Sequence, residues 1–191
     1  MVSPGDRAGS RRRLGARHVV VGALVIVVIA ITITAVLSGR SPKGSALPPE
    51  GPRGGAPAPS FSLTGLRHPT TLVSLGKPNG RPTVVSFFAS WCPNCHKDVG
   101  VLAKARRQLA ASVNFVGVDV ADSRSAGVAL VRSAGMTYPV GFDPNRRVAS
   151  EYQLVGFPST VFLNGSGQVV GHVLGAITQL ELTSWLRRAA S

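Results

Sequence analysis

Cysteine is almost absent from this chain, and the only two, Cys92 and Cys95, are separated by two residues. A framework of structural disulfides is therefore excluded. A disulfide between these two would add little stability, because closing so short a loop stabilises a fold by only about 2 kcal/mol. A structural zinc site needs four ligands, and the histidines include no closely spaced pair. Redox chemistry is the use that the sequence favours, and a copper site built from both cysteines and a remote histidine, such as His172, stays open as the alternative.

Acidic residues are also scarce, since 8 Asp and Glu stand against 21 Lys and Arg, for a formal net charge of +13. Such an excess suits acidic partners or anionic lipid headgroups, or is simply a solvated surface. Only 6% of the residues are aromatic, and no basic stripe is interleaved with them. We therefore predict no nucleic-acid partner.

Charge is missing altogether from residues 19–37, VVVGALVIVVIAITITAVL. As a helix this run spans about 28 Å, close to the hydrocarbon core of a bilayer, so we predict an uncleaved transmembrane helix at 19–38. Arginines are denser before the run than after it, which predicts a basic cytoplasmic tail at 1–18 and an extracytoplasmic remainder. Residues 39–60 are rich in Pro, Gly and Ser and predict a flexible tether, and the folded domain is expected at 61–191. The expected location is thus the cell membrane, crossed once.

Short apolar runs alternate with helical periodicity in the outer domain, which is typical of an α/β fold. Strands are predicted at 82–89, 113–120, 159–163 and 168–174, and helices at 93–112, 123–134, 143–152 and 178–190. The last helix places Trp185 on its apolar face, so this side chain is expected in the core. The cysteine pair lies where a central strand gives way to a helix, the position at which a parallel sheet presents its chemistry.

The residues around the cysteines favour catalysis. Pro93 is suited to the first position of the helix, which makes Cys92 the N-cap. Its sulfur would then face the free N–H groups and the positive end of the helix dipole, which stabilise a thiolate and lower a thiol pKa. We therefore expect Cys92 to attack and Cys95, one turn further in and less exposed, to close the disulfide. The reactive group would be this Cys92–Cys95 disulfide, with no metal and no other cofactor.

The stretch PTVVSFFASWCPNC and the later VGFPST resemble the active-site segments of the thioredoxin superfamily. With a membrane anchor and a tether, the chain is most similar to the ResA/TlpA/CcmG group of extracytoplasmic thiol-disulfide oxidoreductases. The resemblance implies a central mixed sheet flanked by helices, with an inserted helix between Asp119 and Asp143. It also implies a cis Pro158 against the cysteines, a Phe157 backbone free to pair with a substrate peptide, and Trp91 as a surface lid beside the sulfur.

The chain departs from thioredoxin at Ser86, which replaces the buried aspartate that accepts a proton there. ResA-like proteins carry an acid three residues after the second cysteine, and Asp98 occupies that place. Because i and i+3 share a helix face, Asp98 is either a proton acceptor for Cys95 or an ordinary exposed aspartate. His96 likewise either stabilises the Cys92 thiolate or is an idle exposed imidazole.

The sequence thus predicts a membrane-anchored enzyme that exchanges thiols and disulfides with client proteins outside the cytoplasm. The resemblance implies apocytochrome c as one client and a membrane redox partner as the electron donor. Whether the enzyme reduces, oxidises or isomerises disulfides stays open, although the positive charge favours an oxidant modestly. The alternative is an extracytoplasmic copper chaperone that uses the same cysteines.

Overall fold

The computed structural model describes residues 51–191. The transmembrane helix predicted at 19–38, the tail at 1–18 and most of the tether lie outside the described residues. Within the part that is described, no helix is long and apolar enough to cross a membrane.

A five-stranded mixed sheet forms the centre of the domain, in the order β5-β4-β3-β6-β7. The central strand β3 runs parallel to β4, which is parallel to β5, and antiparallel to β6, which pairs with β7. The carboxyl ends of β3, β4 and β5 therefore meet at one edge of the sheet. The bounds are β3 Thr83–Phe88, β4 Asn114–Val120, β5 Val140–Asp143, β6 Ser159–Leu163 and β7 Val169–Leu174.

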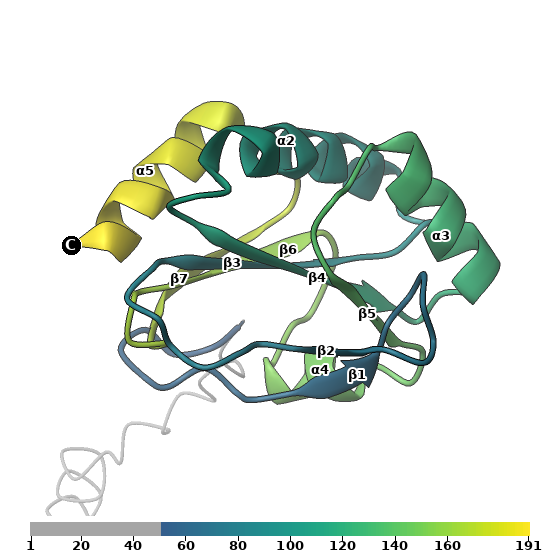
Figure 1. Ribbon diagram of the computed structural model, residues 1–191, viewed down its shortest axis with the longest axis horizontal. Coiled ribbons are helices and arrows are strands. Elements are labelled where there is room, and N and C mark those ends of the chain that lie inside the picture. The colour runs from purple at the N-terminus through teal and green to yellow at the C-terminus, as the bar shows by residue number, and fades with distance from the viewer. Residues whose placement is uncertain (1–50) are drawn as a thin grey trace, which may run out of the picture. The chain divides into compact units, whose positions relative to one another are not determined.

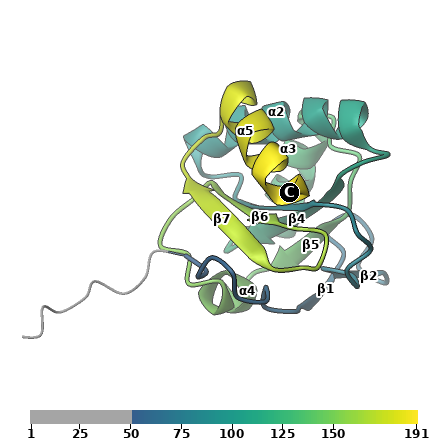
Figure 2. The same cartoon turned by 90° about the vertical axis from the view of Figure 1, so that its left-hand side faces the viewer.

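Helices cover both faces of this sheet. Figures 1 and 2 show α2, α3 and α5 on one face, and α4 with the short β1–β2 hairpin on the other. These elements are α2 Pro93–Leu109, α3 Arg124–Ser133, α4 Arg147–Glu151, α5 Gln179–Ala190, β1 Ser62–Thr64 and β2 Leu72–Ser74. The thioredoxin-like α/β class expected from the sequence is confirmed.

Two hydrophobic cores hold the layers together, and β3 contributes to both because its side chains alternate. Val84 and Phe88 pack on the side of α2 and α5, whereas Val85 and Phe87 pack on the side of α4. Trp185 of α5 packs against the first core as expected, with its ring stacked on Phe162 at 5.4 Å between centroids.

The structure differs from the prediction in three respects. The strands β1, β2 and β5 were not expected, because two span three residues and β5 contains a glycine that interrupts its apolar run. The helix predicted from residue 143 begins only at Arg147, because Asp143 ends β5 and a turn follows. The tether is also shorter than predicted at its outer end. Gly51 donates a hydrogen bond to the Gln153 carbonyl and Gly55 donates one to Val169, so residues 51–58 already belong to the folded unit.

A capping box begins α5. The Thr178 hydroxyl accepts from the Glu181 N–H at 3.2 Å, and the Glu181 carboxylate accepts from the Thr178 N–H at 2.9 Å. We expect Thr178→Ala to lower the free energy of unfolding by about 1 kcal/mol, because one N–H of the first turn loses its partner. Urea denaturation measures this. Thr70→Ala, an exposed change in the β1–β2 turn, is the matched control and should shift stability by less than about 0.5 kcal/mol; an equal loss in both variants contradicts the cap.

Candidate active site

Cys92 is the N-cap of α2, with φ −94° and ψ 112°, and Pro93 is the first residue of the helix, as predicted. Both cysteines are free thiols; Cys92 is 6% exposed and Cys95 is fully buried. The Cys92 sulfur makes no capping bond to the helix N–H groups, which corrects the contact expected from the sequence. Its thiol instead donates to the Phe157 carbonyl at 3.4 Å. The two residues between the cysteines, Pro93 and Asn94, are exposed.

The loop before β6 lies directly against Cys92. The Phe157–Pro158 peptide bond is cis, as the resemblance implied. The Pro158 carbonyl accepts from the Gly175 N–H at 2.8 Å, which ties this loop to the end of β7. The Phe157 ring meets the Trp91 ring edge to face, with 6.3 Å between centroids. Trp91 is 58% exposed, and its indole N–H donates to the Ala121 carbonyl, so it lies at the surface next to Cys92.

Asp98 is fully buried one turn after Cys95, and not on an exposed helix face. One carboxylate oxygen accepts from the Ile177 N–H at 2.9 Å, and the other has no hydrogen-bond partner within residues 51–191. Burial raises the pKa of Asp98 to about 6, against the lowering effect of the Ile177 N–H. Burial also raises the pKa of the Cys95 thiol, with smaller contributions from Cys92 and from the negative charge of Asp98. The free oxygen of Asp98 is therefore an acceptor suited to the Cys95 proton.

A second acidic group, which the sequence reasoning missed, supports the other side of the motif. The Asp122 carboxylate accepts from the Ser90 N–H at 2.6 Å and from the Ser90 hydroxyl at 2.8 Å, so it fixes the residue that precedes Trp91. Asp119 is buried nearby at the end of β4, and neither of its oxygens has a partner within the described part of the chain. Burial, reinforced by the charge of Asp122, raises the pKa of Asp119 to about 8. The sequence contained a signal for this pair, because Asp119 lies near the carboxyl end of the buried strand β4 and Asp122 follows shortly after that strand.

Three other side chains singled out by the sequence lie apart from the sulfurs or bind elsewhere. Ser86 is buried and its hydroxyl lies 3.5 Å from that of Tyr138. The His96 ring is hydrogen-bonded through Nε2 to the Ser90 carbonyl at 2.8 Å. His172 lies on β7 against Gly51, where a side chain on the glycine would touch the imidazole. Among residues 51–191 no three His, Cys, Asp or Glu side chains gather closely enough to hold a metal ion, so the structure does not bring His172 to the cysteine pair.

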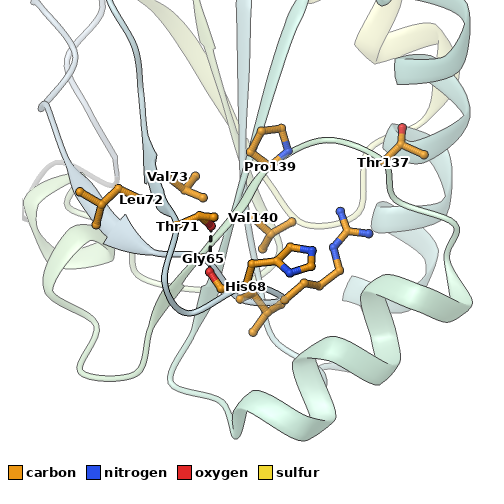
Figure 3. A pocket seen from close by; sticks show the side chains of 10 residues that line it. Gly65, His68, Thr71, Leu72, Val73, Thr137, Pro139 and Val140 are labelled. Atoms are coloured by element: carbon orange, nitrogen blue, oxygen red, sulfur yellow. Dashed lines mark hydrogen bonds between the residues drawn. The ribbon is translucent and has the colours of Figure 1, made fainter.

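A surface hollow of about 350 Å³ lies between the β1–β2 hairpin and the segment that leads into β5. Figure 3 shows its lining, with the Thr71 hydroxyl bound to the His68 carbonyl. The Arg67 guanidinium beside it donates to the Met136 and Tyr138 carbonyls. None of the side chains predicted to carry chemistry lines this hollow, so we place the site at the cysteines.

The fold and the reduced Cys-x-x-Cys pair define the class of protein, a thioredoxin-like thiol-disulfide oxidoreductase. More particularly, the chain belongs to the AhpC/TSA family, whose model matches residues 55–172. It is 28% identical to the thiol-disulfide oxidoreductase ResA of Bacillus subtilis over 133 residues, 69% of this chain and 73% of that protein. It is 30% identical to the thiol:disulfide interchange protein DsbE of Xylella fastidiosa over 162 residues, 84% of this chain and 78% of that protein. Among solved structures it is similar in fold to a thiol:disulfide interchange protein from Chlorobium tepidum. That likeness has a TM-score of 0.64 at 23% identity and covers 73% of this chain and 99% of that one.

Proposed function

We propose that this protein is a membrane-anchored reductant of disulfides in client proteins outside the cytoplasm. The observation that carries the proposal is the pairing of Cys92, which is 6% exposed, with the fully buried Cys95, next to an acid, Asp98, that has one carboxylate oxygen without a partner in the described chain. The location rests on the apolar run at 19–37 and the arginines before it.

The electrons move in two steps. The Cys92 thiolate attacks one sulfur of a client disulfide, that S–S bond breaks, and the other client sulfur leaves as a thiolate and takes up a proton. Cys95 then gives its proton to Asp98 and attacks the Cys92 sulfur of the mixed disulfide. The second client thiol leaves and the Cys92–Cys95 disulfide forms. The client gains two electrons and two protons, and a membrane thiol donor must restore the pair.

The contacts at the sulfurs favour this direction. An oxidant of this kind needs a reduced form that is stabilised, usually as a thiolate. No helix N–H reaches the Cys92 sulfur, His96 is bound to the Ser90 carbonyl, and burial together with Asp98 raises the pKa of Cys95. These observations argue against the modest preference for an oxidant that the net charge suggested.

The proposal predicts a low reduction potential. At equilibrium with glutathione near pH 7, we expect a potential below about −220 mV, within the range of reductants such as thioredoxin and not of strong oxidants near −120 mV. Alkylation of the remaining thiols, followed by mass spectrometry, gives the potential. A value above about −150 mV would show that the protein oxidises its clients.

Clients with paired cysteines fit the site, and the resemblance to the ResA/TlpA/CcmG group supports apocytochrome c as one of them. The relatives are named as a thiol-disulfide oxidoreductase and a thiol:disulfide interchange protein, which supports protein disulfides as the substrate class. Purified full-length protein should reduce a cytochrome-derived Cys-x-x-Cys-His disulfide peptide. Equally fast reduction of free oxidised glutathione would argue against a protein client.

A further inference from the structure

Arg146 has a backbone conformation that usually belongs to glycine. It precedes α4 with φ 59° and ψ 18°, in the left-handed region where an L side chain crowds its own backbone. The turn is fixed on both sides, because the Arg146 N–H donates to the Asp143 carbonyl and its carbonyl accepts from the Ser150 N–H. Strained residues of this kind cluster at binding and catalytic sites, so the place of the side chain is informative.

The Arg146 side chain reaches the rim of the dithiol site. Its guanidinium carbon lies 5.4 Å from the centroid of the Phe157 ring. The same ring touches Trp91, and the carbonyl of the same residue accepts the Cys92 thiol at 3.4 Å. A fixed positive charge therefore borders the place where a client must lie to present its sulfur.

No carboxylate of the described chain neutralises this charge. Between residues 51 and 191 the one ion pair is Arg147–Glu151, at 2.8 Å. The other acids are occupied or inaccessible. Asp122 binds Ser90 and Glu181 caps α5, whereas the remaining three are buried: Asp98, Asp119 and Asp143. An arginine that is exposed and unpaired is available to a carboxylate from another molecule, which it can bind through two parallel hydrogen bonds.

Exposed apolar side chains also lie near Phe157, in the same loop and at the end of β7. Val155 is 57% exposed and Leu174 is 47% exposed. Leu174 lies over Gly156, since a Cβ on that glycine would be 3.2 Å from its Cδ1. With Trp91, these are three of the five large hydrophobic residues that the described chain exposes. The surface near the Cys92 sulfur therefore combines the apolar side chains of Trp91, Val155 and Leu174 with the positive charge of Arg146.

We propose that Arg146 is a specificity-determining residue that selects clients with an aspartate or glutamate close to the reacting cysteine. The client segment lies extended along the loop before β6, with its apolar side chains on Trp91 and Leu174 and its carboxylate on the Arg146 guanidinium. This inference rests on the proposed function, because it concerns the client of the same dithiol.

Two disulfide peptides of equal length test it, one with Glu and one with Gln two positions from the reacting cysteine. Full-length protein in detergent should reduce the Glu peptide with a kcat/KM about tenfold higher at low ionic strength, and the ratio should fall as salt is added. Arg146→Gln should bring the ratio to about one, and Arg146→Lys should restore part of it, because the charge returns without the planar fork. Arg132→Gln, which removes an exposed charge from α3, is the matched control and should keep the wild-type ratio.

Arg146→Gly guards against a folding artefact, because glycine suits the left-handed backbone and also removes the charge. It should lose the preference as Arg146→Gln does. Equal rates on both peptides in the wild type, or a preference that survives in both Arg146→Gln and Arg146→Gly, overturns the inference. So does loss of binding to vesicles of anionic lipid in the Arg146 variants with an unchanged peptide ratio, which would assign the charge to the membrane. If the wild type reduces neither peptide, the proposed function fails instead.

Discussion

Replacing Cys95 with serine should trap the protein in a covalent complex with its client. The Cys92 thiolate can still attack, but the hydroxyl that replaces the Cys95 thiol cannot displace it from the mixed disulfide. The complex should then persist for minutes to hours, the lifetime of a disulfide that rearranges without a catalyst. Non-reducing electrophoresis of acid-quenched cells, followed by mass spectrometry of the bands that reductant dissolves, measures the adducts and identifies the clients.

The control for the trap is the double variant Cys92→Ser with Cys95→Ser. It retains the surface that contacts clients and lacks both sulfurs, so it should give no adduct. Adducts in the double variant would be artefacts, since it has no thiol. The order of the sulfurs is tested by Cys92→Ser alone. If this variant captures the same clients as efficiently as Cys95→Ser, the buried thiol is the attacking group and the assignment drawn from exposure is wrong.

Replacing Asp98 with asparagine should slow the release of reduced client by roughly 10²-fold at pH 7, the lower part of the range for loss of a general base. The carboxylate is present above its pKa of about 6, so the release step in the wild type should accelerate as pH rises through 6. The amide of the Asp98→Asn variant cannot take the proton of Cys95, and that acceleration should disappear. Single-turnover reduction of a peptide disulfide, quenched with acid and separated by chromatography, gives the rate at each pH.

The pH dependence of the free energy of unfolding provides an independent test of the Asp98 carboxyl. The folded protein raises the pKa of Asp98 from 3.8 to about 6, so the folded state holds this proton more tightly than the unfolded state. The associated stability is present below about pH 4 and is lost as pH rises through 6, by about 3 kcal/mol. The difference in unfolding free energy between wild type and Asp98→Asn isolates this contribution, because Asp119 acts in both proteins.

Glu151→Gln is the matched control for the rate of client release and should leave its pH profile unchanged. The same loss of rate in Glu151→Gln would mean that Asp98 acts only through net charge.

The sequence located the cysteine pair correctly, between a central strand and a helix, because its local signals agree. A buried strand, a proline at the first position of a helix and two cysteines one turn apart all lie within residues 83–95, so no distant contact was needed to place them. The cis bond at Pro158 was expected only through the resemblance, since a lone proline in a turn is ordinarily trans.

The parts that the sequence did not predict depend on contacts between distant segments. The buried Asp98 is hydrogen-bonded by the N–H of Ile177, in the segment just before α5 and seventy-nine positions away. Asp122 reaches Ser90 only because β3 and β4 are adjacent and parallel, so that their ends meet. Arg146 follows β5, a strand whose four residues give too short a pattern to read. Sequence periodicity indicates which face of a helix or strand a residue occupies, but it does not indicate which distant segment packs against that face.

The exposure of Asn94 between the two sulfurs has a consequence for how this enzyme can diversify. Its side chain has no hydrogen-bond partner among residues 51–191, while Ser90 before it and Asp98 after it are each tied to distant parts of the domain. Mutation can therefore change this one residue while the contacts of the rest of the domain stay as they are. Such a change, between the two sulfurs, is a route to a different reduction potential. One scaffold can serve lineages or designed variants that need different driving force, and selection can explore that range one substitution at a time.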